Sequence, residues 1–134
     1  NIHFDLTYCP LQHVGYKAVA VNVSDIAAMY AKPLQITVGL AISSKYTVEA
    51  IEELYSGMQA ACTAYQIDIV GGDITSSEKG LTISIHIIGE GENGKIVTRS
   101  GARKNDIVCV TGDLGASYLG LLCLQREKAE FSAN

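Results

Sequence analysis

The chain has 134 residues, 48% of them hydrophobic, and a formal net charge of -4. The length suits one domain with a hydrophobic core, and the acidic balance argues against a general binder of nucleic acids or membrane surfaces. No apolar run reaches the ~18 residues that a transmembrane helix needs.

The cysteines predict a reducing environment. They are widely spaced and contain no C-x-x-C pair, so a zinc site is not expected. They are Cys9, Cys62, Cys109 and Cys123. Three of them lie in apolar stretches, as small core residues do. We therefore expect a cytoplasmic protein. No signal peptide is visible, although the chain does not begin with Met.

The first half of the chain predicts helix, strand and helix. Residues 15–31 are rich in alanine and favour a buried helix, although KAVAVNV within them also alternates as a strand would. Residues 34–41 are a strand by their β-branched content. Residues 47–66 are the clearest helix, with Thr47 as its N-cap. Its apolar stripe consists of Val48, Ile51, Leu54, Tyr55, Met58 and Cys62.

The second half predicts strands and one last helix. Residues 67–71 form a short buried strand, and residues 81–90 alternate between apolar and polar side chains. A turn leads to a short return strand at 96–99, and residues 106–112 are a further strand. Residues 114–129 are helical. The alternation of strands and helices with one hairpin predicts a mixed α/β fold.

Residues 89–94, GEGENG, match the dinucleotide-binding pattern G-x-G-x-x-G. The match is rejected because a strand-like KIVTR follows, so no helix N-terminus is available to bind phosphate. Glu90 and Glu92 would also repel a phosphate group. A hairpin turn is the better interpretation.

The stretch DIVGGDITSSE (68–78) suggests a ligand site. The predicted buried strand ends on Gly71 and Gly72, which permit a sharp turn and close approach of a ligand, and on the carboxylate of Asp73. Carboxylate oxygens suit Mg²⁺, which often bridges protein and substrate phosphates. Taken alone, a plain turn in which Asp73 caps its own backbone is slightly favoured.

Asp25 is a second unusual acid, because it interrupts the apolar run VNVSDIAAM. A buried carboxylate needs a metal, a partner or hydrogen bonds. A helix N-cap formed by Ser24 or Asp25 is the alternative. Asp25 and Asp73 together suggest a shared cation site.

Three other polar candidates are weaker by spacing alone. Arg99 lies in TRSGAR beside a Ser-Gly pair that lets the chain bend, and its guanidinium would suit phosphate oxygens. His3 follows an apolar residue near the start of the chain. Tyr55 could line a pocket, although helix packing would explain it equally well.

Seven segments, taken in order, resemble the thiamine-monophosphate kinase family. They are HFDLTYCPLQHVGYKAVAVNVSDIAAM, AKPLQITVGLAI, ELYSGM, VGGDITSSE, IHIIGE, TRSGAR and VTGDLGAS. That family belongs to the superfamily of aminoimidazole ribonucleotide synthetase and selenophosphate synthetase. The resemblance covers nearly all of the chain, with Tyr30 where the family usually has glycine and Ile74 where it often has threonine.

The resemblance implies a function and a set of site residues. The family transfers the γ-phosphoryl group of ATP onto thiamine monophosphate with several Mg²⁺ ions, which is mostly a matter of positioning and charge neutralisation. We expect direct transfer, because no obvious nucleophile is placed for a phospho-enzyme. By resemblance, the magnesium ligands are Asp25 and Asp73, and the ATP-binding residues are Gly72, Asp73, Arg99 and Tyr55. His3 would contact thiamine monophosphate.

The resemblance also implies an architecture. The family's N-terminal domain is α/β and forms a homodimer in which two sheets join into a barrel. We expect residues 1–134 to be one ATP-binding and dimerisation domain, truncated at both ends and lacking the family's C-terminal domain. Such a fragment would be inactive or nearly so alone.

Two other functions are compatible with these residues. One is a sister enzyme of the superfamily, such as aminoimidazole ribonucleotide synthetase, which would use the same ATP site. The other is a non-catalytic domain that binds nucleotide and dimerises. The retained charges of Asp25, Asp73 and Arg99 argue against the second.

Overall fold

A computed structural model describes residues 3–133, and side chains are described as far as residue 130. By their internal contacts the residues form two compact units. One consists of the N-terminal segment up to Cys9 together with Arg99 onward, and the other runs from Pro10 to Thr98. The expectation of a single domain stays a prediction.

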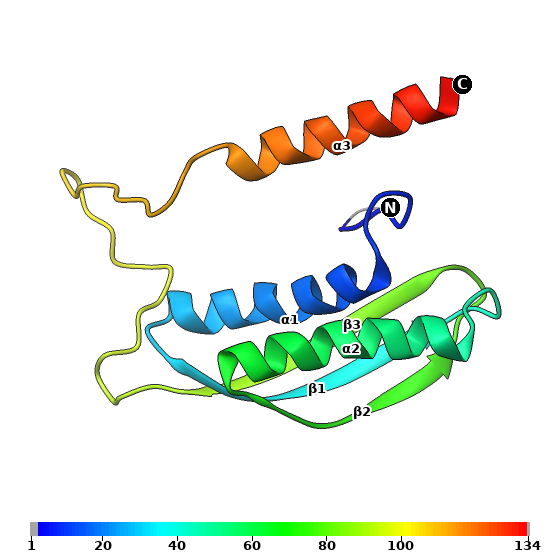
Figure 1. The fold of residues 1–134 in the computed structure, drawn as a ribbon. Helices are drawn as coiled ribbons and strands as arrows, with labels where there is room; N and C mark the ends of the chain where they lie inside the picture. Colours follow the sequence, from blue (N-terminus) through cyan, green and yellow to red (C-terminus); the bar gives the residue numbers. More distant parts are fainter. Residues whose placement is uncertain (1–2, 134) are drawn as a thin grey trace. The chain divides into compact units, whose positions relative to one another are not determined.

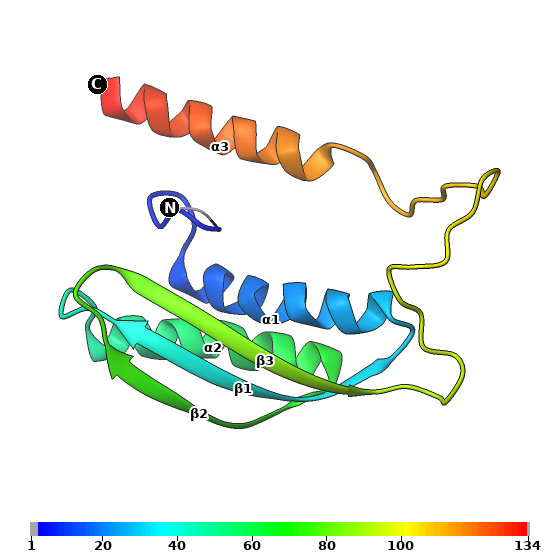
Figure 2. The same cartoon turned by 180° about the vertical axis from the view of Figure 1, so that it is seen from behind.

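The Pro10–Thr98 unit is a three-stranded sheet with two helices on one of its faces (Figures 1 and 2). In chain order its elements are α1 (Leu11–Ala28), β1 (Lys32–Ile42), α2 (Val48–Tyr65), β2 (Asp68–Ser76) and β3 (Leu81–Glu90). The strand order is β2-β1-β3, with β1 parallel to β2 and antiparallel to β3. The predicted mixed α/β fold is confirmed.

The core of this unit lies between the sheet and the helices. Alternate residues of β1 face the helices and are almost fully buried, as expected of a central strand. The buried side chains of these elements include Ile36, Val38, Leu40, Leu54, Met58 and Val19. Cys62 joins them, and burial, together with the negative charge of Asp68, raises the pKa of its thiol.

The other face of the sheet, here called the open face, carries small and polar residues. Cross-strand partners share a face, so the register with β1 defines its members. They include Thr37, Gly39, Ala41, Asp73, Thr75, Thr82, Ser84 and His86, and the exposed Ile88 lies on the same face towards the end of β3. Neither α1 nor α2 covers this face (Figure 2).

Helices α1 and α2 approach each other closely at two glycines. A Cβ added to Gly57 would lie 1.8 Å from the carbonyl oxygen of Gln12, and one added to Gly15 would lie 2.0 Å from that of Leu54. No side chain fits at either position unless the helices separate.

Helix α2 confirms the expected N-cap. Thr47 precedes the helix in an extended conformation, and its side chain accepts a hydrogen bond from the Ala50 N–H at 3.3 Å. Glu49 lies in the first turn, where hydrogen bonds from its own backbone N–H and from Thr47 lower the pKa of its carboxyl. Its contribution to stability is therefore present above the unfolded pKa and is lost as the pH falls through the lower folded value.

Replacing Thr47 by Ala should lower the unfolding free energy of the Pro10–Thr98 unit by about 1 kcal/mol, because the Ala50 N–H loses its partner. Urea denaturation followed by circular dichroism measures this change. Thr47→Ser keeps the hydroxyl and should behave like the unsubstituted protein. Equal losses in the two variants would contradict the capping role.

Two elements of this unit differ from their predicted bounds by more than two residues. The helix expected at 15–31 begins earlier, directly after Pro10, and ends earlier because Tyr30 adopts a left-handed conformation with φ 58°. The strand expected at 67–71 does not end at the two glycines. It continues through Asp73 to Ser76, because every residue from Gly71 to Ser76 pairs with β1.

The other unit contains one helix, α3 (Ala116–Ala133), close to the predicted 114–129. The strand predicted at 106–112 is absent, and so is the one predicted at 96–99, most of which belongs to the Pro10–Thr98 unit, since no described strand pairs with either segment. Within 106–112, Ile107 and Val108 are 88% and 96% exposed. Cys109 and Cys123 are also exposed, so the expectation that they are core residues was wrong. None of the helices described in residues 3–133 is long and apolar enough to cross a bilayer.

Candidate functional site

An apolar groove of about 460 Å³ lies beside α2, next to the C-terminal ends of β1 and β2. We call it the Tyr55 groove; its lining includes Ile42, Tyr46, Ile51, Glu52, Tyr55 and Ile74. Tyr55 comes from the middle of α2 and Ile74 from β2, where its side chain is 52% exposed. The parallel pairing of β1 and β2 brings these residues together, because α2 makes the connection between the two strands.

The sequence-predicted residues Gly72 and Asp73 lie on β2 immediately before Ile74. Asp73 pairs with Gly39, is exposed and belongs to the open face, whereas Ile74 alternates to the face that the helices cover. The groove therefore contains Tyr55 and Ile74 but neither Gly72 nor Asp73. Asp73 is next to Ile74 in β2, and its side chain lies on the opposite face of the sheet.

Gly72 also has a structural role that spacing did not reveal. A Cβ at this position would lie 2.0 Å from the carbonyl oxygen of Val38, whereas a Cβ at Gly71 would have no heavy atom within 4 Å. The two glycines are thus not equivalent. The close approach at Gly72 keeps β2 against β1 and so fixes the position of Asp73.

Replacing Gly72 by Ala should destabilise the Pro10–Thr98 unit by about 1–3 kcal/mol, because β2 must move away from Val38. Thermal unfolding measures this loss. The matched control is Gly71→Ala, which introduces the same methyl group one residue earlier into open space. A similar fall in Tm for both variants would show that the contact with Val38 does not matter.

Asp25 lies far from this region within one copy of the chain. It is exposed, and it sits within α1 near the helix C-terminus, so it is neither buried nor an N-cap. The next residue, Ile26, packs on Gly89, which pairs with Pro33 at the N-terminal end of β1. Asp73 pairs with Gly39, which lies six residues after Pro33 on β1, so the two pairs are roughly 20 Å apart along this strand. The Asp73 side chain also lies on the face of the sheet opposite to α1.

A cation site shared by Asp25 and Asp73 is therefore not assembled by the described residues of one chain. Among the described residues, no group of three or more His, Cys, Asp or Glu side chains could hold a metal ion. Both residues stay predictions as magnesium ligands.

His3 and Arg99 belong to the other unit. Both are exposed. The bend expected beside Arg99 is present, since Gly101 has a φ of 115°, which favours glycine. Their roles in binding substrate and ATP stay predictions.

Sequence reasoning missed Tyr46 and Ile74 as groove residues. The sequence could have indicated Ile74, because it is an apolar side chain in the otherwise polar run DITSSE. The sequence around Tyr46 gave no such indication, since this residue lies between β1 and α2, where a tyrosine could equally face solvent.

Comparison with known families identifies this fold. The model of the AIR synthase related protein, N-terminal domain, matches residues 1–91. The chain belongs to this family. The match covers all five elements of the sheet-and-helix layer up to Glu90, so the AIR synthase-like fold expected from the sequence is confirmed.

The similar proteins within the AIR synthase family include thiamine-monophosphate kinases. A curated relative from Bacillus subtilis named thiamine-monophosphate kinase is 44% identical over 127 residues, which is 95% of this chain and 39% of the relative. The crystal structure of thiamine monophosphate kinase from Aquifex aeolicus is similar with a TM-score of 0.81 and 39% identity, covering 95% of this chain and 42% of that chain.

A structure described as AaThiL complexed with AMPPCP and TMP is similar with a TM-score of 0.84. Its identity to this chain is 40%, over 94% of this chain and 40% of that chain. These relatives confirm the predicted resemblance. The chain spans about two-fifths of the length of the relatives that it matches.

Proposed function

We propose that the protein containing this chain is a thiamine-monophosphate kinase, which transfers the γ-phosphoryl group of ATP directly onto thiamine monophosphate to form thiamine diphosphate. The observation that carries the proposal is the Tyr55 groove beside Gly72 and Asp73, in a chain 40% identical to a structure described as complexed with AMPPCP and TMP. AMPPCP is an ATP analogue that resists transfer of its terminal phosphoryl group.

The groove offers the chemistry that a nucleotide base needs. Its apolar and aromatic lining, including Tyr46, Ile51, Tyr55 and Ile74, would cover a planar ring. Asp73 directly precedes Ile74 on the edge strand β2, so the phosphates of a nucleotide in the groove would have to pass round the edge of β2 to reach its carboxylate on the open face. By the resemblance, Arg99 would bind ATP and His3 would contact the thiamine substrate.

The donor set at Asp73 fits Mg²⁺. This ion takes oxygen ligands and is commonly bound through one or two carboxylates, with waters and substrate phosphates completing the shell. A single exposed carboxylate such as Asp73 is therefore sufficient on the protein side. When bound, the ion would neutralise phosphate charge. Asp25 would hold a second ion elsewhere or serve a neighbouring copy.

The open face supports a homodimer. Its residues are mostly small or polar, Ile88 is exposed at one end, and no helix of this unit covers it. A second copy could therefore pack against it, and the two sheets could form the barrel that we expect of the family. Cytoplasmic location and the absence of nucleic-acid or membrane partners are part of the same proposal, in keeping with the net charge of -4.

The test is turnover by the intact protein with Mg-ATP and a panel of acceptors. ADP release together with thiamine diphosphate, formed only when thiamine monophosphate is the acceptor, is the expected result. Turnover with the amide precursor of aminoimidazole ribonucleotide instead would indicate the sister enzyme. ATP binding without consumption of any acceptor would indicate a non-catalytic nucleotide-binding domain.

A further inference from the structure

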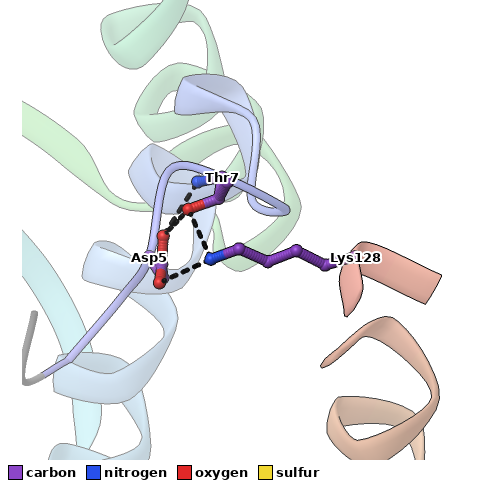
Figure 3. A network of polar contacts seen from close by, with 3 residues as sticks. All are labelled: Asp5, Thr7 and Lys128. Atoms are coloured by element: carbon purple, nitrogen blue, oxygen red, sulfur yellow. Dashed lines mark hydrogen bonds and ion pairs between the residues drawn. The ribbon is translucent and has the colours of Figure 1, made fainter. Parts of the chain in front are cut away.

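The N-terminal segment contacts α3 through the side chain of Lys128 (Figure 3). Lys128 Nζ donates a hydrogen bond to Thr7 Oγ1 at 3.0 Å and lies 3.6 Å from Asp5 Oδ2. The same ammonium group is 5.7 Å from the centre of the Tyr8 ring, within cation–π range. Three residues of one short segment thus converge on a cation that lies 121 residues from Thr7 in the sequence.

The segment that Lys128 contacts is already folded as a turn. The Thr7 backbone N–H donates to Asp5 Oδ1 at 2.9 Å, the Thr7 hydroxyl bonds the same oxygen, and the Cys9 N–H bonds the Asp5 carbonyl at 3.1 Å. These hydrogen bonds from Thr7, helped by the charge of Lys128, lower the pKa of the Asp5 carboxyl. One carboxylate oxygen closes the turn while the other faces Lys128.

The Lys128 contact is better shielded than a typical surface ion pair. The Lys128 and Asp5 side chains are 40% and 27% exposed, whereas the Arg126–Glu130 pair on the same helix is 82% and 64% exposed. Arg126 pairs within its own helix, but Lys128 joins two segments that are distant in sequence. Lys128 is therefore suited to hold the turn in place, and Arg126 provides a matched cation without that connection.

We propose that Lys128 is a positioning residue that holds the turn at Asp5–Cys9 against α3 and so places His3 for binding of the phosphorylated substrate. His3 lies two residues before Asp5, so any movement of the turn displaces it. This inference rests on the proposed function, because the role of His3 comes from that proposal. Lys128 itself need not touch the substrate.

The first measurement follows the turn directly and needs no activity. Hydrogen exchange by mass spectrometry on the intact protein should show faster exchange in the peptide that contains Thr7, Tyr8 and Cys9 after Lys128→Ala. Lys128→Arg keeps the cation and should restore much of the protection. Arg126→Ala should leave this peptide unchanged. Unchanged exchange in Lys128→Ala would overturn the proposal.

The second measurement separates binding from chemistry. Lys128→Ala should raise KM for thiamine monophosphate roughly two- to five-fold, as loss of a partly exposed charge contact does, while kcat and KM for ATP stay constant. Faster exchange with an unchanged KM would overturn the positioning role and leave the kinase intact. Absence of kinase turnover in the unsubstituted protein would instead defeat the proposed function, and the exchange result would still decide whether Lys128 holds the turn.

Discussion

Replacing Gly57 by Ala should lower the unfolding free energy of the Pro10–Thr98 unit by about 3 kcal/mol, the upper part of the range for overpacked sites. The new methyl carbon would lie 1.8 Å from the Gln12 carbonyl oxygen, 2.7 Å from its carbon and 3.0 Å from its Cα. Backbone atoms cannot rotate away as a side chain can, so α1 and α2 must separate along their contact. The buried side chains on both helices, Val19 and Leu54 among them, would then lose packing.

The control for this prediction is the preceding residue. Ser56 is exposed, and its hydroxyl bonds only the Glu53 carbonyl of its own helix among the hydrogen bonds described. Ser56→Ala introduces the same residue type one position earlier and should change stability little, because alanine favours helix. Urea midpoints of the two variants give the comparison. If Gly57→Ala lowered the unfolding free energy by less than about 1 kcal/mol, α1 and α2 would be able to separate easily. That result would contradict the prediction that the close approach of the helices at Gly57 excludes a side chain.

Replacing Asp73 by Asn should lower kcat/KM for thiamine diphosphate formation by about 100-fold or more, comparable to the loss of a group that stabilises transition-state charge. The amide keeps the size of the side chain but removes the charge that would bind Mg²⁺ beside the nucleotide phosphates. Asp73 is exposed and pairs through its backbone with Gly39, so the fold should not change. The Mg²⁺ concentration needed for half-maximal rate should rise in the variant.

Asp68 is the matched carboxylate on the same strand. It is also exposed, but it lies at the other end of β2, opposite Gln35 and away from Ile74 and the Tyr55 groove. Asp68→Asn should therefore retain nearly full activity. If Asp73→Asn and Asp68→Asn were equally active, Asp73 would not be a metal ligand, although the kinase could stand. Equal inactivation of both would point to a general effect of charge on β2.

The sequence was most informative where local and tertiary signals agree. Helix α2 has a capping Thr47, an apolar stripe that contains Leu54 and Met58, and a left-handed Gln66 at its end. Strand β3 alternates in burial as its sequence alternates in polarity. Both elements were predicted almost to the residue, because each pattern has one structural explanation.

The errors arose where structure depends on distant partners. Gly71 and Gly72 looked like the end of a strand, yet pairing with β1 carries β2 on to Ser76. Residues 106–112 have the composition of a strand but no described neighbour to pair with. Propensity cannot supply a hydrogen-bonding partner, and a strand without one is not stable.

The candidate site was predictable in part. Tyr55 lines the groove, and Gly72 and Asp73 directly precede the groove residue Ile74 on β2, but their roles in binding stay predictions. The separation of Asp25 from Asp73 along β1 and across the sheet could not be read from the residues around Asp25. Tyr30 has a left-handed conformation at the end of α1, where the resemblance predicts glycine. Glycine takes this conformation without strain, whereas a tyrosine takes it at some cost.

The central position of β1 has a consequence for how the chain folds. Even the closest paired ends of β1 and β3, Ile42 and Leu81, are separated in sequence by all of α2 and β2. Neither neighbour of β1 can join it through a local hairpin, so the sheet requires closure of long loops before its pairing gains stability. Folding of Pro10–Thr98 should accordingly be slow for its size and highly cooperative, and peptides that end before β3 should not retain the β1–β2 pair.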